Sequence, residues 1–314
     1  MDVKPKLSIV IPLYNEAPNL AALYERLSAV LKKQSLSYEL IFVDDGSRDG
    51  SYDKILELAQ KDHQVKALSF SRNFGHMLAL AAGLDYSRGD AVITLDADLQ
   101  HPPELIPELI ARWQSGAEVV NTLRQESVGA GLLKKMTAGF FYWLMARVTK
   151  INLPANAADY RLLDRKVVET LKGMKERSRF LRGLISWVGY KQEFVPYKAE
   201  ARVAGTTKYT FSRMLAFAID GFTSFSTFPL RLATYLGLLV SFFDFLYIVY
   251  AICVRLFTNQ AIPGWTSVLV AVLFLGGVQL IFLGVIGEYL SRVFDEVKAR
   301  PLYIVSRKIG FDEN

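Results

Sequence analysis

The sequence contains a single cysteine, Cys253, and this scarcity excludes an intramolecular disulfide and any metal site built from several cysteines. Oxygen atoms are therefore the expected ligands for any bound metal. No run of Lys and Arg forms a nucleic-acid-binding arm, so no nucleic-acid partner is expected. The first apolar run, residues 7–13, is too short for a signal-peptide core and is followed at once by Asn15 and Glu16. We expect the N-terminus to stay in the cytoplasm.

Apolar residues, in contrast, are abundant. They make up 51% of the 314 residues, which is high for a soluble protein of this size and requires that they be concentrated somewhere. The formal net charge of +6 suits a partner that carries phosphate, or an anionic membrane surface. The length predicts one large domain plus an appendage.

The first part of the chain alternates short apolar runs with helical patterns, which predicts β/α units around a mostly parallel sheet. A helix over 51–61 is expected to begin at Asp49 as its N-cap. From about 132 to 198 the pattern is mainly helical. This part of the sequence predicts a nucleotide-binding α/β domain over residues 1–210. The expected strands are residues 7–13, 38–44, 65–70, 90–96 and 117–123, and a further helix is expected over 19–33.

Two later stretches are long enough to cross a membrane. Residues 232–254 are apolar apart from Asp244, and residues 265–287 carry no charge; a spanning helix needs about 20 such residues. A buried hairpin of a soluble protein is the alternative. The aromatic segment 211–230 is expected to lie along the membrane interface. The predicted organisation is completed by a transmembrane region over 231–290 and a tail over 291–314.

The distribution of Lys and Arg predicts the orientation of the two spans. The connector 255–264 contains one positive residue, whereas several Lys and Arg precede the first span and follow the second. By the positive-inside rule, both chain ends face the cytoplasm. We therefore expect a multi-pass integral membrane protein with its large domain in the cytoplasm, and the role of Asp244 stays open.

Asp96 and Asp98 stand at the end of the strand expected at 90–96. Carboxylates two residues apart at a strand end can point toward one site at the carboxyl edge of a sheet. Such oxygen ligands suit Mg²⁺ or Mn²⁺, which bridges the two phosphates of a nucleotide sugar. Two Asp residues after a strand also occur as caps and turns, so the placement of this pair carries the prediction.

Other strands also end in polar residues. Residues 12–16 (PLYNE) follow the first strand and residues 43–47 (VDDGS) follow the second. Tyr14 can stack on a base, while Asp44 or Asp45 can bond to base or ribose; a simple turn is the alternative for residues 45–47. The third strand leads to Arg72 and to His76, which we expect to be a polar residue at a helix start.

These motifs resemble those of inverting family 2 glycosyltransferases with a GT-A fold. The residues that carry the resemblance are 9–15 (IVIPLYN), 43–47 (VDDGS), 70–75 (FSRNFG), 95–102 (LDADLQHP) and 159–162 (DYRL). Within that family the chain is similar to the polyisoprenyl-phosphate glycosyltransferases, which include dolichyl-phosphate mannose synthase and the GtrB-type enzymes of bacteria. The similarity covers almost the whole chain, including the two spans.

The resemblance implies a role for each matching residue. Asp159 corresponds to the candidate catalytic base near the acceptor, and Thr207 stands where relatives commonly carry Ser. The nucleotide sugar is expected to contact Pro12, Tyr14, Asn15, Glu16, Asp44, Asp45, Arg72 and Asp96. The metal, Mg²⁺ or Mn²⁺, is expected to contact Asp96, Asp98 and Gln100. The phosphate of the acceptor is expected to contact Arg124, Arg202, Thr207 and Lys208.

The implied reaction transfers a hexose, with UDP-glucose favoured as donor, to a polyprenyl phosphate such as undecaprenyl phosphate. The phosphate oxygen is already ionised, so Asp159 can orient the acceptor as well as remove a proton; a loop salt bridge with Arg161 or Arg165 is the structural alternative. A nucleotidyltransferase is a rival, but no Gly-rich phosphate loop follows the first strand. A catalytically inactive membrane scaffold is the other rival. The exact sugar, the polyprenol length and any homo-oligomer stay open, and a bacterial inner membrane is the favoured location.

Overall fold

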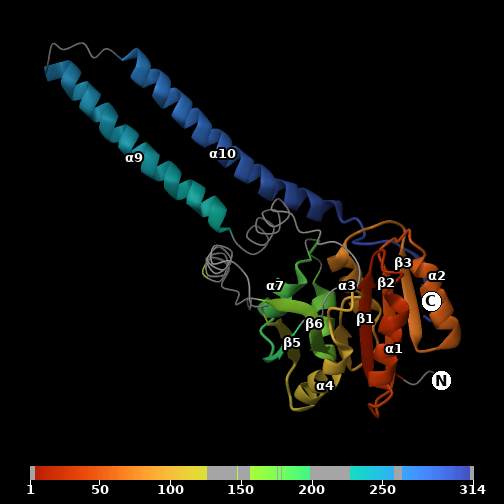
Figure 1. Ribbon diagram of the computed structural model, residues 1–314. Helices are drawn as coiled ribbons and strands as arrows, with labels where there is room; N and C mark the ends of the chain where they lie inside the picture. Colours follow the sequence, from red (N-terminus) through yellow and green to blue (C-terminus); the bar gives the residue numbers. More distant parts are fainter. Residues whose placement is uncertain are drawn as a thin grey trace. The chain divides into compact units, whose positions relative to one another are not determined.

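The computed structural model describes residues 4–125, 147, 156–174, 176–177, 179–198, 227–257 and 264–311. The chain divides into two compact units, which Figure 1 shows as a ribbon. The first unit comprises Met1–Leu215 together with Arg300–Asn314, and the second comprises Ala216–Ala299. Residues 211–226 of the predicted interfacial segment lie outside the described residues, as do Arg202, Thr207 and Lys208.

The first unit is built on an eight-stranded sheet with the order β7-β5-β6-β4-β1-β2-β3-β8. All strands except β6 and β8 run in one direction, so the expected mostly parallel sheet is confirmed. The strands are β1 (Leu7–Leu13), β2 (Tyr38–Asp44), β3 (Val65–Phe70), β4 (Ala91–Thr94), β5 (Val119–Arg124), β6 (Ala157–Asp164), β7 (Gln192–Tyr197) and β8 (Val305–Ile309).

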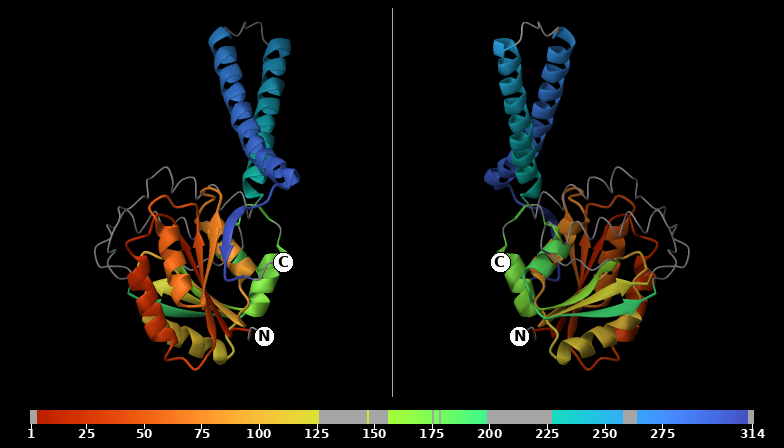
Figure 2. Two further views of the ribbon diagram at one scale, coloured as in Figure 1. Left: turned by 90° about the vertical axis from the view of Figure 1, so that its right-hand side faces the viewer. Right: turned by 90° about the vertical axis from the view of Figure 1, so that its left-hand side faces the viewer.

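Helices cover both faces of this sheet (Figure 2), which is why β1 and β2 are buried along their whole length and consist mostly of apolar residues. One layer contains α1 (Leu20–Leu31), α2 (Ser51–Lys61), the 3₁₀ turn η1 (Pro103–Leu105) and α4 (Ile106–Gln114). The other contains α3 (His76–Tyr86), α6 (Arg165–Gly173) and α7 (Leu181–Trp187).

The helix α3 lies very close to the central strand β1. A Cβ atom added at Gly83 would lie 2.1 Å from Cγ1 of Val10, so only glycine allows this approach without a shift of the strand. Alternate residues of β1, such as Ile9 and Ile11, belong instead to the core shared with the leucines of α1. The sheet is thus fixed between two layers, and its strand ends are held in constant positions.

The bounds of β1, β2, β3 and α2 agree with the sequence predictions, and those of β4 and β5 differ by at most two residues at each end. The N-cap of α2 and the region 132–198 differ from the predictions. The N-cap of α2 is Gly50, with a φ of 85° and no side-chain cap, while Asp49 accepts hydrogen bonds from the backbone and hydroxyl of Ser51. The region expected to be mainly helical from 132 to 198 contains strands β6 and β7, because both complete the sheet by pairing with β5.

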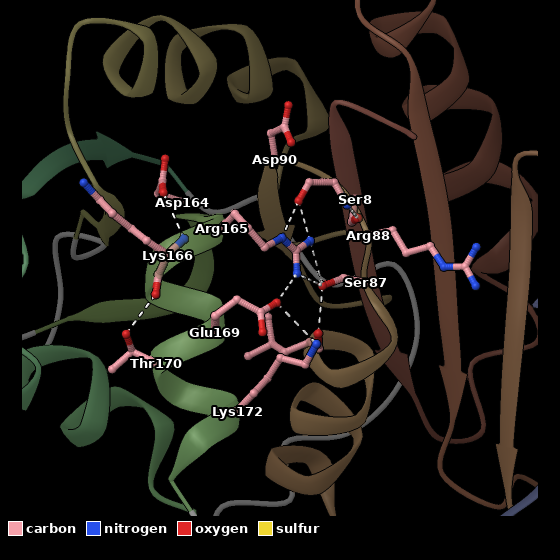
Figure 3. Close-up of polar contacts among 12 residues, drawn as sticks. Ser8, Ser87, Arg88, Asp90, Asp164, Arg165, Lys166, Glu169, Thr170 and Lys172 are labelled. Carbon is pink, nitrogen blue, oxygen red and sulfur yellow. Dashed lines mark hydrogen bonds and ion pairs between the residues drawn. The ribbon is translucent and has the colours of Figure 1, made fainter. Parts of the chain in front are cut away.

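The corner between β6 and α6 lies at the amino edge of the sheet (Figure 3). Asp164 caps α6 by accepting the N–H of Lys166 at 3.0 Å. Arg165 donates to the carbonyl oxygen of Gly89 and to Ser87 Oγ. The segment before β4 is therefore tied to the end of β6, which fixes the antiparallel register between these two strands.

A second polar cluster at the same edge surrounds Glu39, the second residue of β2. Its Oε1 accepts hydrogen bonds from Ser8 Oγ and from the backbone N–H of Arg88, and Oε2 lies 2.9 Å from Nζ of Lys66. Ser8 and Glu39 are buried. Buried polar groups need such partners to offset the loss of hydration, and here the partners come from the protein itself.

The C-terminal residues 291–314, expected to form a tail, contain the end of a helix and then strand β8. This strand pairs antiparallel with β3 at the edge of the sheet. Just before it, the ring of Tyr303 stacks on Phe70 at 5.1 Å and its hydroxyl donates to Asp85. The pairing gives the outer backbone groups of β3 hydrogen-bond partners. The chain therefore ends within the unit in which it begins.

The second unit contains two long helices that contact each other, α9 (Phe228–Phe257) and α10 (Trp265–Lys298). Each holds a stretch long and apolar enough to cross a membrane, Leu230–Val254 and Phe274–Lys298. The first agrees with the predicted span 232–254. The second lies later than the predicted span 265–287, because α10 continues without a break through both.

Candidate active site at the carboxyl edge of the sheet

The carboxyl ends of the parallel strands meet at one edge of the sheet, where the antiparallel β6 begins. Thr94, the last residue of β4, pairs with Arg161 of β6. Asp159 therefore extends toward the residues that follow β4, which include Asp96 and Asp98. The topology thus brings Asp159 to the aspartates that precede it by more than sixty positions in the sequence.

Asp44 and Asp45 organise the loops at this edge. Asp44 accepts hydrogen bonds from the backbone N–H of Ser47 and from Ser69 Oγ, and only 1% of it is exposed. Asp45 accepts the backbone N–H groups of Phe74 and Gly75, at 2.6 and 2.9 Å. Burial raises the pKa of Asp45, despite these two hydrogen bonds. Asp44 thus joins the turn after β2 to strand β3, and Asp45 joins it to the loop after β3.

Gly46 explains why these two loops can lie so close together. Its φ is +73°, and a Cβ atom there would lie 2.7 Å from the backbone carbon of Arg72. The turn predicted for residues 45–47 is therefore present, and it also sets the position of Arg72. The guanidinium of Arg72 lies 4.1 Å from the centre of the Phe74 ring, an arrangement that holds this cation by a cation–π contact.

The segment after β1 lies against the same turn. Tyr14 is 37% exposed, as expected for a ring that stacks on a ligand, while Pro12 is enclosed in β1. Asn15 adopts a φ of 56° and its side chain accepts the backbone N–H of Arg48. Glu16 accepts a hydrogen bond from the side-chain amide of Asn19. Of this group, Tyr14 and Asn15 are exposed and can meet a bound molecule.

The turn that contains Asp96 and Asp98 carries backbone strain. Leu99 has a φ of 63°, which is uncommon for a residue with a side chain, and Asp98 Oδ1 accepts the N–H of Gln100. Asp96 Oδ1 is buried yet has no hydrogen-bond partner. Its nearest cation is Nε2 of His76, at 3.4 Å. A buried carboxylate oxygen without a partner is costly, so this atom gains from a cation or a ligand.

Aromatic residues pack next to this turn. His101 stacks on Tyr160 at 5.2 Å and meets the edge of Tyr197, while Tyr160 donates its hydroxyl hydrogen to the carbonyl oxygen of Pro102. The side-chain oxygen of Gln100 accepts a hydrogen bond from Arg124 at 3.2 Å. The structure therefore joins one predicted metal ligand, Gln100, to one predicted phosphate-binding residue, Arg124.

Asp159 lies on strand β6 and not in a loop, and it is 6% exposed. Its Oδ1 accepts hydrogen bonds from Arg161 Nη2 at 2.9 Å and Arg182 Nε at 2.8 Å, and its Oδ2 accepts from Arg182 Nη2 at 2.8 Å. The pairing with Arg161 was one predicted alternative, whereas Arg165 lies at the opposite edge. Burial favours the protonated acid, but Arg182, His76 and Arg161 hold the pKa of Asp159 well below its usual range.

His76 connects the two acidic positions of the site. As the first residue of α3, it places Nε2 3.4 Å from Asp96 Oδ1 and 3.7 Å from Asp159 Oδ2. Burial opposes its charged form, but the nearby carboxylates of Asp159 and Asp96 raise the pKa of His76. The sequence places His76 at a helix start, and that is correct, but it gives no sign that both aspartates are its neighbours.

Arg182 is a second residue that the sequence analysis does not identify. It comes from α7, more than twenty residues after Asp159. Nothing in its local sequence distinguishes it from other arginines, because its partner is defined only when β6 and α7 pack together. Arg182 is found only by asking which cation pairs with the buried carboxylate of Asp159 in the folded protein.

The site offers two carboxylates for a metal, Asp96 and Asp98. Among the described residues, no group of three or more His, Cys, Asp or Glu side chains is arranged to hold a metal ion. Mg²⁺ is commonly held by one or two carboxylates plus substrate phosphates, and the unpartnered Oδ1 of Asp96 meets that requirement. The residues present therefore fit a divalent cation that arrives with a phosphorylated substrate.

Comparison with known families identifies the chain. The sequence profile of Glycosyl transferase family 2 matches residues 8–172. This chain belongs to glycosyl transferase family 2. A second profile, the GtrB C-terminal hairpin, matches residues 228–293 and so covers α9 and most of α10. The predicted resemblance and the GT-A fold class are confirmed, and the protein is a glycosyltransferase.

Relatives of this glycosyltransferase align over nearly its whole length. The uncharacterized glycosyltransferase YkcC of Bacillus subtilis (strain 168) is 47% identical over 305 residues, which cover 97% of this chain and 94% of YkcC. The bactoprenol glucosyl transferase of Shigella phage SfV is 43% identical over 303 residues, which cover 96% of this chain and 99% of the phage protein. The prophage bactoprenol glucosyl transferase homolog of Escherichia coli (strain K12) is also 43% identical, over 302 residues, 96% of this chain and 99% of its own.

Solved structures are more distant from this glycosyltransferase. A glucosyl-3-phosphoglycerate synthase from Mycobacterium tuberculosis, in complex with phosphoglyceric acid, is 16% identical, with a TM-score of 0.48. The alignment covers 70% of this chain and 79% of that chain. The family assignment rests on the two profiles and on the relatives that align along the whole chain.

Proposed function

We propose that this glycosyltransferase transfers a glucosyl group from UDP-glucose to the phosphate of a membrane polyprenol, with inversion at the anomeric carbon. The products are polyprenyl-phosphate glucose and UDP. The observation that carries the proposal is that the alignment with bactoprenol glucosyl transferases runs through both the catalytic domain and the helical hairpin, over 96% of the chain. The relatives share this chain's whole architecture and not only its sugar-transfer domain.

The carboxylates of Asp96 and Asp98 bind the donor together with a divalent cation, Mg²⁺ or Mn²⁺. When bound, this cation supplies positive charge to the diphosphate as the bond to the sugar breaks. Tyr14 stacks on the base, and Arg72, held over the ring of Phe74, adds a second positive charge near the donor. Asp44 and Asp45 hold the loops that carry these groups, since their own oxygens are taken by backbone and hydroxyl donors.

A phosphate oxygen of the acceptor forms the new bond to the anomeric carbon while the bond to the UDP oxygen breaks. Attack from the face opposite the departing diphosphate inverts the anomeric configuration. The nucleophile is already ionised at neutral pH, so the protein contributes mainly position and charge. Arg124 lies at the end of β5 beside Gln100 and is the described member of the predicted acceptor-phosphate group.

The direct test uses the purified full chain with Mg²⁺, radiolabelled UDP-glucose and undecaprenyl phosphate in detergent. We expect label in the organic phase, and we expect NMR of the product to show an anomeric configuration opposite to that of the donor. Retention of configuration rejects the inverting mechanism. Label that appears only with another nucleotide sugar rejects UDP-glucose but keeps the polyprenyl acceptor, and no transfer with any nucleotide sugar rejects the proposed reaction.

We further propose that α9 and α10 cross the membrane as a hairpin, with both chain ends in the cytoplasm. The chain leaves the first unit after Leu215 and re-enters it at Arg300, and its end pairs with β3 of the catalytic sheet. A segment that leaves a folded unit and returns to it must cross the membrane an even number of times. The two apolar helices supply two crossings.

Cysteine labelling tests this topology. The native Cys253 is first replaced by Ala, and single cysteines are then introduced at Asn259, in the connector, and at Asn314. In intact cells, a membrane-impermeant thiol reagent is expected to label position 259 and to leave position 314 unlabelled until the membrane is opened. Labelling of both positions in intact cells contradicts the hairpin.

A further inference from the structure

The carboxylate of Asp159 is surrounded by cations that differ in exposure. Arg161 lies on the same strand and its side chain is 5% exposed, so it is enclosed in the protein. Arg182 approaches from α7 and retains 31% of its side-chain surface exposed while using two nitrogens, Nε and Nη2, on both oxygens of Asp159. One guanidinium of the pair thus reaches the surface of the site in a fixed orientation.

This geometry is poorly suited to proton removal by Asp159. A general base needs an accessible lone pair within hydrogen-bonding distance of the proton that it takes. Both oxygens of Asp159 already accept hydrogen bonds from guanidinium groups, and the side chain is 7% exposed. A phosphate nucleophile, in addition, has little need of a base at neutral pH. The carboxylate is arranged to hold cations.

We propose that Arg182 binds a phosphate group of the substrates, and that Asp159 is the positioning residue that holds its guanidinium. The proposal rests on the proposed function, because that function supplies two phosphate-bearing substrates. A guanidinium is a planar, permanently charged fork of N–H donors that suits phosphate as well as carboxylate, and 31% of the Arg182 side chain is exposed. The bidentate pair fixes the plane of this fork before the substrate arrives.

The surroundings of Arg182 support a phosphate as its ligand. Arg182 is bound to Asp159, whose Oδ2 lies 3.7 Å from Nε2 of His76, and the same nitrogen lies 3.4 Å from Oδ1 of Asp96. Arg182 therefore shares a neighbourhood with Asp96, one of the two proposed metal ligands. Both the diphosphate of the donor and the phosphate of the acceptor must come to this neighbourhood for transfer to occur, and binding measurements distinguish the two.

The first experiment measures binding without turnover. The full chain in neutral detergent is titrated separately with UDP in the presence of Mg²⁺ and with undecaprenyl phosphate. We expect Arg182→Ala to raise the Kd of one of these two by about 10- to 100-fold, the range for one hydrogen-bonded charge pair. Weaker binding of undecaprenyl phosphate assigns Arg182 to the acceptor, and weaker binding of UDP assigns it to the donor.

The matched control is Arg112→Ala. Arg112 also pairs with two carboxylates, those of Glu108 and Glu193, but it lies on α4 away from the site. Its removal is expected to leave both Kd values within about twofold of wild type, since pairs of this exposed kind contribute little. If Arg182→Ala leaves both Kd values as unchanged as the control does, the proposal is overturned.

A double-mutant cycle tests the positioning role of Asp159. If Asp159 acts through Arg182, Asp159→Asn weakens the same ligand as Arg182→Ala, and the double variant is no weaker than Arg182→Ala alone. Methylguanidinium added to Arg182→Ala is expected to recover several-fold of the lost binding, whereas a purely structural role gives no recovery. A further loss of more than tenfold in the double variant overturns the positioning role.

These outcomes are independent of the identity of the sugar. If the wild type fails to transfer glucose from UDP-glucose yet binds undecaprenyl phosphate, the proposed donor fails while the role of Arg182 is still decided by the Kd values. If Asp159→Asn does not fold, Arg182→Lys replaces it. Lysine keeps the charge but lacks the fork, so binding intermediate between wild type and Arg182→Ala supports the positioned guanidinium, and binding equal to wild type contradicts it.

Discussion

The two edges of the central sheet both contain buried charge, but they use it differently. At the amino edge, Arg165 donates to the carbonyl oxygen of Gly89 and to Ser87, and Glu39 accepts from Ser8 and the backbone. These polar groups join one strand to another. At the carboxyl edge, the equivalent groups hold loops and present side chains outward. The same residue types therefore secure the fold at one edge and form a candidate binding site at the other.

The difference follows from where each polar atom finds its partner. The guanidinium of Arg165 is taken up by the carbonyl oxygen of Gly89, by Ser87 Oγ and by the exposed carboxylate of Glu169, whereas Arg182 is held by a buried carboxylate and stays partly exposed. Asp96 Oδ1 is buried without a hydrogen-bond partner, which is costly unless a ligand binds. The polar groups of the amino edge bind other groups of the protein. At the carboxyl edge, the oxygen without a partner is the kind of group expected where a ligand binds.

The largest expected effect is at the carboxyl edge. Asp98→Ala should lower kcat by about 100- to 1,000-fold, because loss of one charge-stabilising group at a reacting centre has effects of this size. The thermal midpoint should stay close to wild type, since Asp98 is partly exposed. Activity in EDTA should be lost as well. Near-wild-type turnover in EDTA would contradict a metal at this site.

A second variant tests the opposite edge. Arg165→Ala removes hydrogen bonds to Gly89 O and Ser87 Oγ and should reduce the free energy of unfolding by about 1–3 kcal/mol. The kcat at 25 °C should stay within about twofold of wild type, because the reacting groups are at the other edge. Thermal unfolding and steady-state kinetics measure both. A kinetic defect without loss of stability would show that the two edges are not functionally separate.

The smallest expected effect concerns Asp85, which accepts a hydrogen bond from Tyr303. Burial raises its pKa, against the opposing effects of Tyr303 and nearby positive charges. The folded state thus holds this proton more tightly than the unfolded state does, so stability should fall as the pH rises from the ordinary value near 3.8 through the raised pKa. Asp85→Asn should remove this loss of stability, which we expect to be less than about 1 kcal/mol.

Urea unfolding at several pH values checks this sign. The urea midpoint of Asp85→Asn should rise relative to that of wild type between pH 4 and pH 7. Tyr303→Phe is the matched variant, because it removes a hydrogen bond that favours the ionised carboxyl and should steepen the loss for wild-type Asp85. A urea midpoint of Asp85→Asn that falls relative to wild type as the pH rises would contradict this prediction.

Much of the architecture could be predicted because it is local or periodic. The runs that became β1, β2 and β3 are mostly apolar, since both faces of a doubly covered sheet are buried. The two expected spans were visible because they are long apolar stretches, interrupted only by Asp244 in the first. The strands β6, β7 and β8 escaped prediction. β6 carries Asp159 and Arg161 inside an otherwise apolar run, and β8 is a short edge strand whose three middle residues are exposed.

The candidate site, like the fold, was predictable only in part. The sequence by itself determined which strand ends carry polar groups, because Asp44, Asp96 and Tyr14 each follow a recognisable apolar run. It could not determine which of these side chains would be taken up by neighbours. Asp45 is closed off by two backbone N–H groups from the loop after β3, and only the packing of that loop places them there.

Only the tertiary structure decided the environment of Asp159. An isolated sequence offers Arg161 and Arg165 as nearby partners, and the antiparallel direction of β6 sends them to different places: Arg161 stays at the carboxyl edge, and Arg165 lies at the amino edge. His76 and Arg182 arrive from separate helices. A pKa depends on charges within a few ångströms regardless of their distance in sequence, so the state of this carboxylate is set by the fold and not by its neighbours in the chain.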